Sequence, residues 1–226
     1  MAQIIQHFKR NVKGRDLAVG DIHGHFSRLA TALERAGFSA AAGDRLFSVG
    51  DLVDRGPESE KALEWLAQPW FHAVRGNHED TAIRYASGNP VDRTSYSANG
   101  GDWFMALAPE RQQEFRTAFS KLPYAIEVET GRGVVGLVHA NVATNDWNEL
   151  AVALRANRRS RDKVIWDRSR VEYTDRSIVC GIRAVVVGHT PLRRVTVLGN
   201  VHHIDTGGWM TDGYFTLLDL ATLKSV

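Results

Sequence analysis

Several side chains that can bind a metal ion stand just after short apolar runs of the chain. In four cases one glycine separates the run from the polar residue: Asp21, Asp51, Asn77 and His189. His139 follows its run directly. His23 adds another imidazole close behind Asp21. Oxygen ligands combined with imidazole nitrogen suit Mn, Fe or Zn rather than a metal that prefers thiolate. Six side chains exceed the needs of one catalytic ion, so two ions that share a carboxylate fit better.

The apolar runs predict buried strands, because each is short and most are bounded by glycine. They span residues 17–19, 46–49, 71–75, 134–138 and 184–187. Glycine permits a sharp turn just past a strand. In open α/β sheets, ligands bind in the crevice beyond the carboxyl ends of the strands. We therefore expect the polar residues that follow the runs to converge, although they lie far apart in the sequence.

Helical patterns separate the first runs. Residues 26–36 carry an apolar stripe with Gly37 as the expected stop, and Pro57 is expected in the first turn of a helix that reaches Leu66. The first third of the sequence therefore predicts the element order β-α-β-α-β, with helices that cover a largely parallel sheet.

Later segments are less regular. Residues 109–119 predict a further helix, and residues 201–205 and 214–220 predict β structure. Residues 87–102, rich in Gly, Asn and Ser, predict a loop that helps to shape the substrate cleft, while residues 141–183 fit no single pattern.

Composition sets broad limits on the kind of protein. The 226 residues predict one domain, 1–226, and the net charge of +2 gives no reason to expect a nucleic-acid partner. Arginines crowd residues 155–170, which predicts either a solvated surface or an anion-attracting rim near the site. The single cysteine, Cys180, fits a reducing compartment. Without a signal sequence or a long apolar stretch, we expect a cytoplasmic protein with no membrane partner.

The same neighbourhood offers groups for phosphoryl transfer. A seryl or threonyl alkoxide is a poor leaving group, so an acid must protonate it. His78, beside Asn77, is the candidate acid, and Asp54 would orient it and favour its protonated form. Arg55 and Arg75 flank two of the ligand positions and can fork onto phosphate oxygens.

Three segments resemble known signatures. Gly20-Asp21-Ile22-His23-Gly24, Gly50-Asp51-Leu52-Val53-Asp54-Arg55-Gly56 and Gly76-Asn77-His78-Glu79 are similar to GDxHG, GDxxDRG and GNHE. In this order they resemble the serine/threonine phosphoprotein phosphatase family, in its phage-lambda and bacterial branch, within the calcineurin-like metallophosphoesterases. His139 and Gly188-His189-Thr190 extend the resemblance over nearly the whole chain.

The resemblance implies a fold, a ligand set and site roles. The fold is α/β, with two mixed β-sheets in a sandwich flanked by helices. One divalent ion would be held by Asp21, His23 and a bridging Asp51, and a second by Asp51, Asn77, His139 and His189. His78 with Asp54 would be the acid dyad. Arg55, Arg75 and Arg168 would bind the substrate phosphate, with Arg170 as the alternative to Arg168. Mn²⁺ is expected at both sites, and Fe or Zn are the alternatives.

The implied reaction is hydrolysis of phosphoserine and phosphothreonine in proteins by direct attack of a hydroxide that bridges the metal ions. Phosphotyrosine or phosphohistidine are expected as further substrates, and no regulatory subunit is implied. The alternative is a diadenosine-tetraphosphate hydrolase, whose pattern lacks the aspartate of Asp-Arg-Gly and reads GNHD. Asp54 and Glu79 favour the protein phosphatase. A nucleotide or RNA-end phosphoesterase is a weaker option. An inactive scaffold is disfavoured because no ligand is missing. Trp103 and Trp209 are expected to be packing residues.

Overall fold

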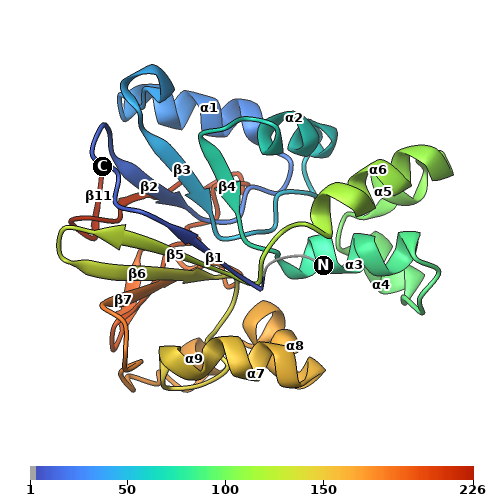
Figure 1. The fold of residues 1–226 in the computed structure, drawn as a ribbon. Helices are drawn as coiled ribbons and strands as arrows, with labels where there is room; N and C mark the ends of the chain where they lie inside the picture. The colour runs from blue at the N-terminus through green and yellow to red at the C-terminus, as the bar shows by residue number, and fades with distance from the viewer. Residues whose placement is uncertain (1–3) are drawn as a thin grey trace.

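The structure is a computed structural model that describes residues 4–226. Two β-sheets lie face to face, and helices cover their outer faces (Figure 1). The first sheet has the order β1 (Ile5–Phe8), β5 (Ala125–Thr130), β6 (Gly133–Val138), β7 (Ala184–Val187), β9 (Val201–His203), β8 (Thr196–Leu198). The second has the order β11 (Lys224–Ser225), β10 (Leu217–Asp219), β2 (Asp16–Val19), β3 (Arg45–Ser48), β4 (Phe71–Ala73). Both sheets mix parallel and antiparallel pairs.

The helices form two outer layers. Figure 1 shows α1 and α2 over the sheet of β2, β3 and β4, and α7, α8 and α9 against the other sheet. Their bounds are α1 (Phe26–Arg35), α2 (Ala62–Leu66), α3 (Asn77–Ala86), α4 (Arg93–Ala98), α5 (Asp102–Met105), α6 (Pro109–Phe119), α7 (Leu150–Ala156), α8 (Arg158–Trp166) and α9 (Ser169–Glu172). Short 3₁₀ turns occupy Ala40–Ala42, Ser59–Lys61 and Trp147–Glu149. No helix within residues 4–226 has the length and apolar character that a membrane crossing needs.

Strand β2 illustrates why the apolar runs are continuous rather than alternating. Leu17 and Val19 pack with the helices of their own layer, while Ala18 belongs with Phe47 and Ile126 to the core between the two sheets. Because both faces of the strand are buried, every position in it is apolar apart from Asp16 at its start. The interior between the sheets is thus a packed core, and the polar residues are left to the strand ends.

Most of the predicted elements are confirmed. The β-α-β-α-β order corresponds to β2, α1, β3, α2 and β4, with the three strands parallel. Helix α6 begins and ends where the sequence predicts, and Gly37 follows α1 with a φ of 63°. The sandwich of two mixed sheets implied by the family resemblance is also confirmed.

Two predictions are wrong. Pro57 lies in a turn before the 3₁₀ segment at Ser59 and not in the first turn of α2. Residues 87–102 are not one loop, because they contain the whole of α4 and the first residue of α5. Asp92 accepts from the backbone N–H of Ser95 and so caps α4, a local signal that the Gly-rich and Ser-rich composition concealed.

Candidate active site

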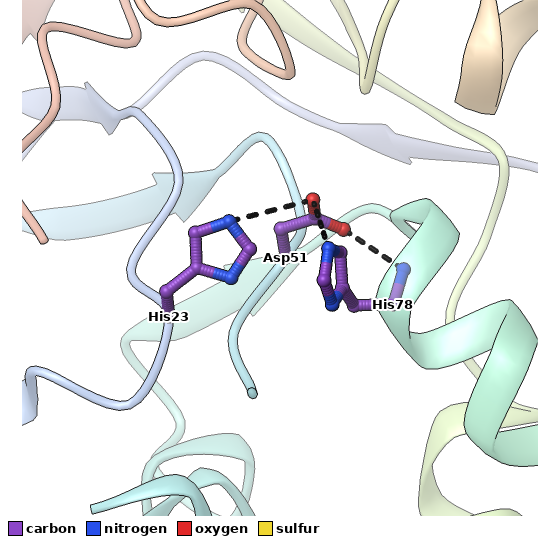
Figure 2. Close-up of side chains that lie close together, drawn as sticks. All are labelled: His23, Asp51 and His78. Atoms are coloured by element: carbon purple, nitrogen blue, oxygen red, sulfur yellow. Dashed lines mark hydrogen bonds and ion pairs between the residues drawn. The ribbon is translucent and has the colours of Figure 1, made fainter. Parts of the chain in front are cut away.

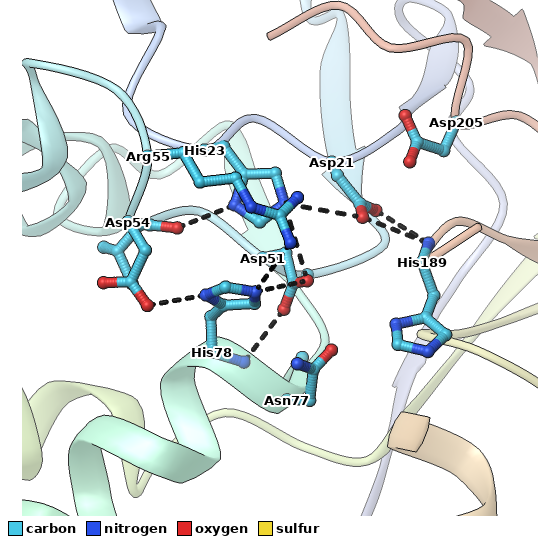
Figure 3. A network of polar contacts seen from close by, with 12 residues as sticks. Asp21, His23, Asp51, Asp54, Arg55, Asn77, His78, His189 and Asp205 are labelled. Carbon is cyan, nitrogen blue, oxygen red and sulfur yellow. Dashed lines mark hydrogen bonds and ion pairs between the residues drawn. The ribbon is translucent and has the colours of Figure 1, made fainter. Parts of the chain in front are cut away.

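The predicted convergence is present in the structure. Asp21, Asp51 and Asn77 follow β2, β3 and β4 of one sheet, while His139 and His189 follow β6 and β7 of the other. All five side chains are buried at the edge where the two sheets meet. Residues at the strand ends of both sheets therefore form one site, which Figure 3 shows from close by.

The carboxylate of Asp51 lies at the centre of this site. Its Oδ1 accepts from the backbone N–H of His78 at 3.1 Å, at the start of α3. Its Oδ2 lies 3.7 Å from His23 Nε2 and 3.3 Å from His139 Nε2, so it faces an imidazole on either side. Figure 2 shows Asp51 between His23 and His78. One oxygen is thus anchored to the helix, and the other is placed as a shared ligand would be.

Glu79 fixes the backbone around Asp51, a role that the sequence pattern did not reveal. Its Oε2 accepts from the N–H groups of Asp51 at 3.0 Å and Gly76 at 2.9 Å, and its Oε1 accepts from Leu52 at 2.8 Å. Burial, together with the charge of Asp51, raises the pKa of Glu79 to about 7. The carboxylate joins the turn after β3 to the start of α3, so two signature segments are held in one geometry.

Backbone carbonyl groups determine which ring nitrogens face the site. His23 Nδ1 lies 2.9 Å from the carbonyl oxygen of Val53, and His139 Nδ1 lies 2.8 Å from that of Val49. Each Nδ1 donates to its carbonyl oxygen, which leaves the Nε2 atom pointing inward. His139 Nε2 then lies 2.9 Å from Asn77 Oδ1 and 3.1 Å from His189 Nδ1.

Gly188 leaves room for the remaining carboxylate. Asp21 accepts from the backbone N–H of His189 at 3.0 Å, so the turn after β7 anchors it. A Cβ atom on Gly188 would lie 2.2 Å from Asp21 Oδ1. The glycine before His189 is therefore required by the close approach of a carboxylate as well as by the turn.

The charges of the site favour bound cations. Burial and the charge of Asp205 raise the pKa of Asp21 well above its usual range. Burial lowers the pKa of His139, but the carboxylate of Asp51 outweighs this and raises it to about 10. A proton on His139 Nε2 thus joins acceptor atoms that would otherwise repel one another. Within residues 4–226, neither Asp21 nor Asp51 forms an ion pair with lysine or arginine.

A divalent cation would neutralise these groups more fully than a proton does, so the donor set fits metal ions. Two groups of residues have ligand atoms close enough to hold a metal ion, namely His23, Asp51 and His78, and Asp51, His139 and His189. Asp51 belongs to both groups.

The candidate acid is paired as the sequence predicts. His78 Nδ1 lies 2.6 Å from Asp54 Oδ2, and both residues are buried. Burial lowers the pKa of His78, but the charges of Asp51 and Asp54 outweigh it and raise the pKa. His78 also lies in the first turn of α3, so the helix fixes its backbone. An unexpected third partner, Trp103, donates from Nε1 to Asp54 Oδ1 at 2.7 Å.

The arginines that the sequence treats alike occupy different environments. Arg55 is exposed, and its Nη1 and Nη2 lie 2.7 Å from His23 Nε2 and 3.3 Å from His78 Nε2. Arg75 is buried, and its guanidinium donates to Tyr124 Oη at 3.2 Å and to the carbonyl oxygen of Ser120 at 3.1 Å. Arg55 therefore faces the site, whereas Arg75 is bound to the segment before β5.

The Arg-rich segment divides in the same way. Arg168 Nε lies 3.2 Å from His189 Nε2, at the edge of the site. Arg170 is buried and donates to Asn141 Oδ1 and to the carbonyl oxygens of Asp175 and Ser177. The geometry favours Arg168 over Arg170 as a group that can reach a substrate.

Two further residues lie near the site; the sequence assigned no role to Asp205 and expected Trp209 only to pack. Asp205 is buried beside Asp21 (Figure 3), and its Oδ1 accepts from the N–H of Gly207 at 2.9 Å. Trp209 lies under the guanidinium of Arg55, 4.4 Å from its carbon to the ring centre. A turn-prone stretch, Thr206-Gly207-Gly208, separates the two residues in the sequence.

Comparisons with known proteins agree with this geometry. Residues 15–205 match the family described as calcineurin-like phosphoesterase. Serine/threonine-protein phosphatase 1 of Salmonella typhimurium is 37% identical over 194 residues, which cover 84% of each chain. An asymmetrical bis(5'-nucleosyl)-tetraphosphatase of a Geobacillus species is 26% identical over 207 residues, again 84% of each chain.

A solved structure confirms the fold. A protein serine/threonine phosphatase from Saccharomyces cerevisiae superposes with a TM-score of 0.63 at 15% identity, over 97% of this chain and 78% of that one. The signatures at Asp21, Asp51 and Asn77 all fall within the matched residues 15–205. The chain belongs to the calcineurin-like phosphoesterase family and, within it, to the bacterial serine/threonine phosphoprotein phosphatases.

Proposed function

We propose that this protein is a metal-dependent phosphoprotein phosphatase that hydrolyses phosphoserine and phosphothreonine. The observation that carries the proposal is the buried pair of His78 and Asp54, whose Nδ1 and Oδ2 atoms lie 2.6 Å apart. An alkoxide leaves poorly unless it is protonated, so a dedicated acid has value for a serine or threonine ester. A nucleoside phosphate leaves more easily and needs such an acid less.

The residues of the chain divide the work of the reaction. His78 holds a proton on the imidazole and donates it to the leaving oxygen, while Asp54 orients the ring and favours the charged form. Arg55 faces the site with two nitrogen atoms and would bind two phosphoryl oxygens. Arg168 approaches from the side of His189 and is the second candidate for phosphate binding.

We further propose that two divalent ions bind here, with Mn²⁺ as the expected metal in vitro. Asp21, His23 and Asp51 would hold one, and Asp51, Asn77, His139 and His189 the other. When bound, such ions supply a nucleophile from water at neutral pH and neutralise charge on the phosphoryl oxygens. The support is the shared Asp51 Oδ2, which lies between the inward nitrogens of His23 and His139. A cytoplasmic location and a single domain stay predictions from the sequence.

The decisive test compares two substrates with purified, metal-stripped protein. Turnover of a phosphoserine peptide and of diadenosine tetraphosphate is measured with and without added Mn²⁺. We expect Mn²⁺-dependent preference for the peptide, abolished in Asp51→Asn and strongly reduced in His78→Asn. A clear preference for the dinucleotide would replace the proposed substrate with the alternative one. Unchanged peptide turnover in both variants would overturn the assigned roles.

A further inference from the structure

Both carboxylate oxygens of Asp54 are engaged, each by a different part of the chain. Oδ2 pairs with His78 Nδ1, and Oδ1 accepts from the indole N–H of Trp103 at 2.7 Å. We propose that Trp103 is a positioning residue of the proton-donating dyad, which holds Asp54 and through it the ring of His78. The inference rests on the proposed function, since the dyad matters only where His78 protonates a leaving group.

Trp103 is placed to act as a rigid donor. It lies in α5, and its ring packs edge-on against Phe104 at 5.4 Å and Phe115 at 5.2 Å between ring centres. Phe104 and Phe115 are fully buried. The indole N–H therefore cannot follow Asp54 if the carboxylate moves, so it fixes the orientation of that carboxylate.

The segment before Trp103 touches the same turn from the backbone side. A Cβ atom on Gly100 would lie 2.2 Å from the backbone nitrogen of Arg55. Asp54 and Arg55 have φ values of 70° and 67°, in the left-handed region that non-glycine residues rarely adopt. Residues 100–103 thus pack against a strained turn that carries both the orienting carboxylate and the arginine that faces the site.

Loss of the indole N–H would release one end of the carboxylate. Asp54 is fully buried, and Oδ1 has no other hydrogen-bond donor within the described residues. An unsatisfied buried oxygen favours rotation of the carboxylate toward another donor, which weakens its hold on His78. Trp103 contacts neither the ligand side chains nor Arg55 in these hydrogen bonds, so substrate binding should be spared.

The test uses substrates that differ in their need for an acid. Trp103→Phe removes the N–H and keeps an aromatic ring. With a phosphoserine peptide we expect kcat to fall about 10–100-fold, the range for loss of an orienting partner, with little change in KM. With 2,4-dinitrophenyl phosphate, whose leaving group departs without a proton, we expect kcat to change little. The ratio of the two kcat values does not depend on the fraction of folded protein.

Two controls separate positioning from a general structural role. In an Asp54→Asn background, Trp103→Phe should cause no further loss, because the path from Trp103 to His78 is already broken. Trp65→Phe is the matched control, since Trp65 also packs among aromatic rings, at 5.2 Å from Phe26 and 5.3 Å from Phe71, away from the dyad. It should leave the ratio unchanged.

The outcomes distinguish this inference from the function on which it rests. Equal losses on both substrates, or an undiminished loss in the Asp54→Asn background, would overturn the role of Trp103 while an active wild type upholds the phosphatase. A wild type that does not turn over the phosphoserine peptide with Mn²⁺ would overturn the proposed function and the inference together.

Discussion

Replacement of Arg55 by alanine and replacement of Arg75 by alanine should have different effects on the protein. Both flank signature residues, and the sequence assigns both to phosphate. Arg55 is exposed and turns its guanidinium to His23 and His78, where a phosphoryl group would enter. Arg75 is buried, and its guanidinium donates hydrogen bonds to Tyr124 and to the carbonyl oxygen of Ser120. We expect Arg55→Ala to impair phosphate binding and Arg75→Ala to impair folding.

The expected sizes follow from these contacts. A hydrogen bond to a charged group contributes about 1.5–3 kcal/mol, so loss of Arg55 should weaken inhibition by inorganic phosphate about 10- to 150-fold. The free energy of unfolding should change by less than about 0.5 kcal/mol, because removal of this exposed side chain opens the nitrogens of His23 and His78 to water. Arg75→Ala leaves a partly buried carbonyl oxygen and a partly buried tyrosine hydroxyl without their donor, which costs about 2–4 kcal/mol in total. Its cation–π contact with Tyr124, at 4.8 Å, is lost as well.

The two quantities are measured on the same preparations. Urea unfolding gives the free energy, and inhibition of turnover by phosphate gives the binding constant. Arg158→Ala is the control, because the one ion pair of Arg158 within the described residues is with half-exposed Asp162, so its loss should alter neither quantity. Equal destabilisation by Arg55→Ala and Arg75→Ala would refute the reasoning. So would weakened phosphate inhibition by Arg75→Ala in a protein of normal stability.

Three further predictions concern the carboxylates, the ions and a remote histidine. Gly188→Ala should weaken Mn²⁺ binding at least about tenfold in calorimetry, because the new Cβ atom would lie 2.2 Å from Asp21 Oδ1 and push that carboxylate aside. Normal Mn²⁺ affinity in this variant would show that the Cβ atom does not displace Asp21. Chelation should abolish turnover and lower stability, and Mn²⁺ at about 100 times its Kd should return about 2.7 kcal/mol in urea unfolding; stability that ignores Mn²⁺ would argue against a site in the folded chain. Burial, aided by Arg45, lowers the pKa of His72 from 6.5 to about 4. Between these values the unfolded chain takes up a proton that the folded chain excludes, so stability should fall as the pH drops from 6.5 toward 4. His72→Phe should flatten that fall, and an unchanged pH profile would refute the assignment.

The convergence of the candidate ligand side chains was predictable, because each of them follows a strand and the strand ends lie together. Each apolar run predicts a buried strand, and each strand ends at the same edge of the sandwich. Asp51 and His139 therefore meet across a separation of 88 residues (139 − 51), and the family resemblance supported the prediction for His139. The position after the strand, rather than the neighbouring residues, brings each ligand to the site.

The supporting residues were not predictable, since nothing local marks them. Trp103 reaches Asp54 across 49 positions, from a short helix that the sequence pattern did not predict. Glu79 sits within a signature, yet its contacts with Asp51 and Leu52 depend on how α3 meets the turn after β3. Arg75 carries the expected charge, but the packing of Tyr124 decides which way its guanidinium points. These roles depend on side-chain direction in three dimensions, which spacing along the chain does not encode.

The backbone of the site gives a last prediction about the cost of this arrangement. Seven residues other than glycine have a positive φ within the described chain, and five belong to the site: His23, Asp51, Asp54, Arg55 and His189. Such a conformation costs on the order of 1–3 kcal/mol for each residue, and glycine would avoid the cost. The contacts that these side chains make in the site therefore outweigh the backbone strain that glycine would relieve.

Arg55 allows this cost to be measured, because it is exposed and because glycine and alanine variants lose the same contacts with His23 and His78. At a φ of 67°, Arg55→Gly should be more stable than Arg55→Ala by about 1 kcal/mol, the reverse of the usual order of the two residues. Both variants should lose phosphate binding to the same degree, since both lose the guanidinium. Equal stability, or a more stable alanine variant, would show that the turn at Asp54 and Arg55 is not strained. In that case, the contacts of Gly100 and Trp103 with this turn would not be holding a strained backbone.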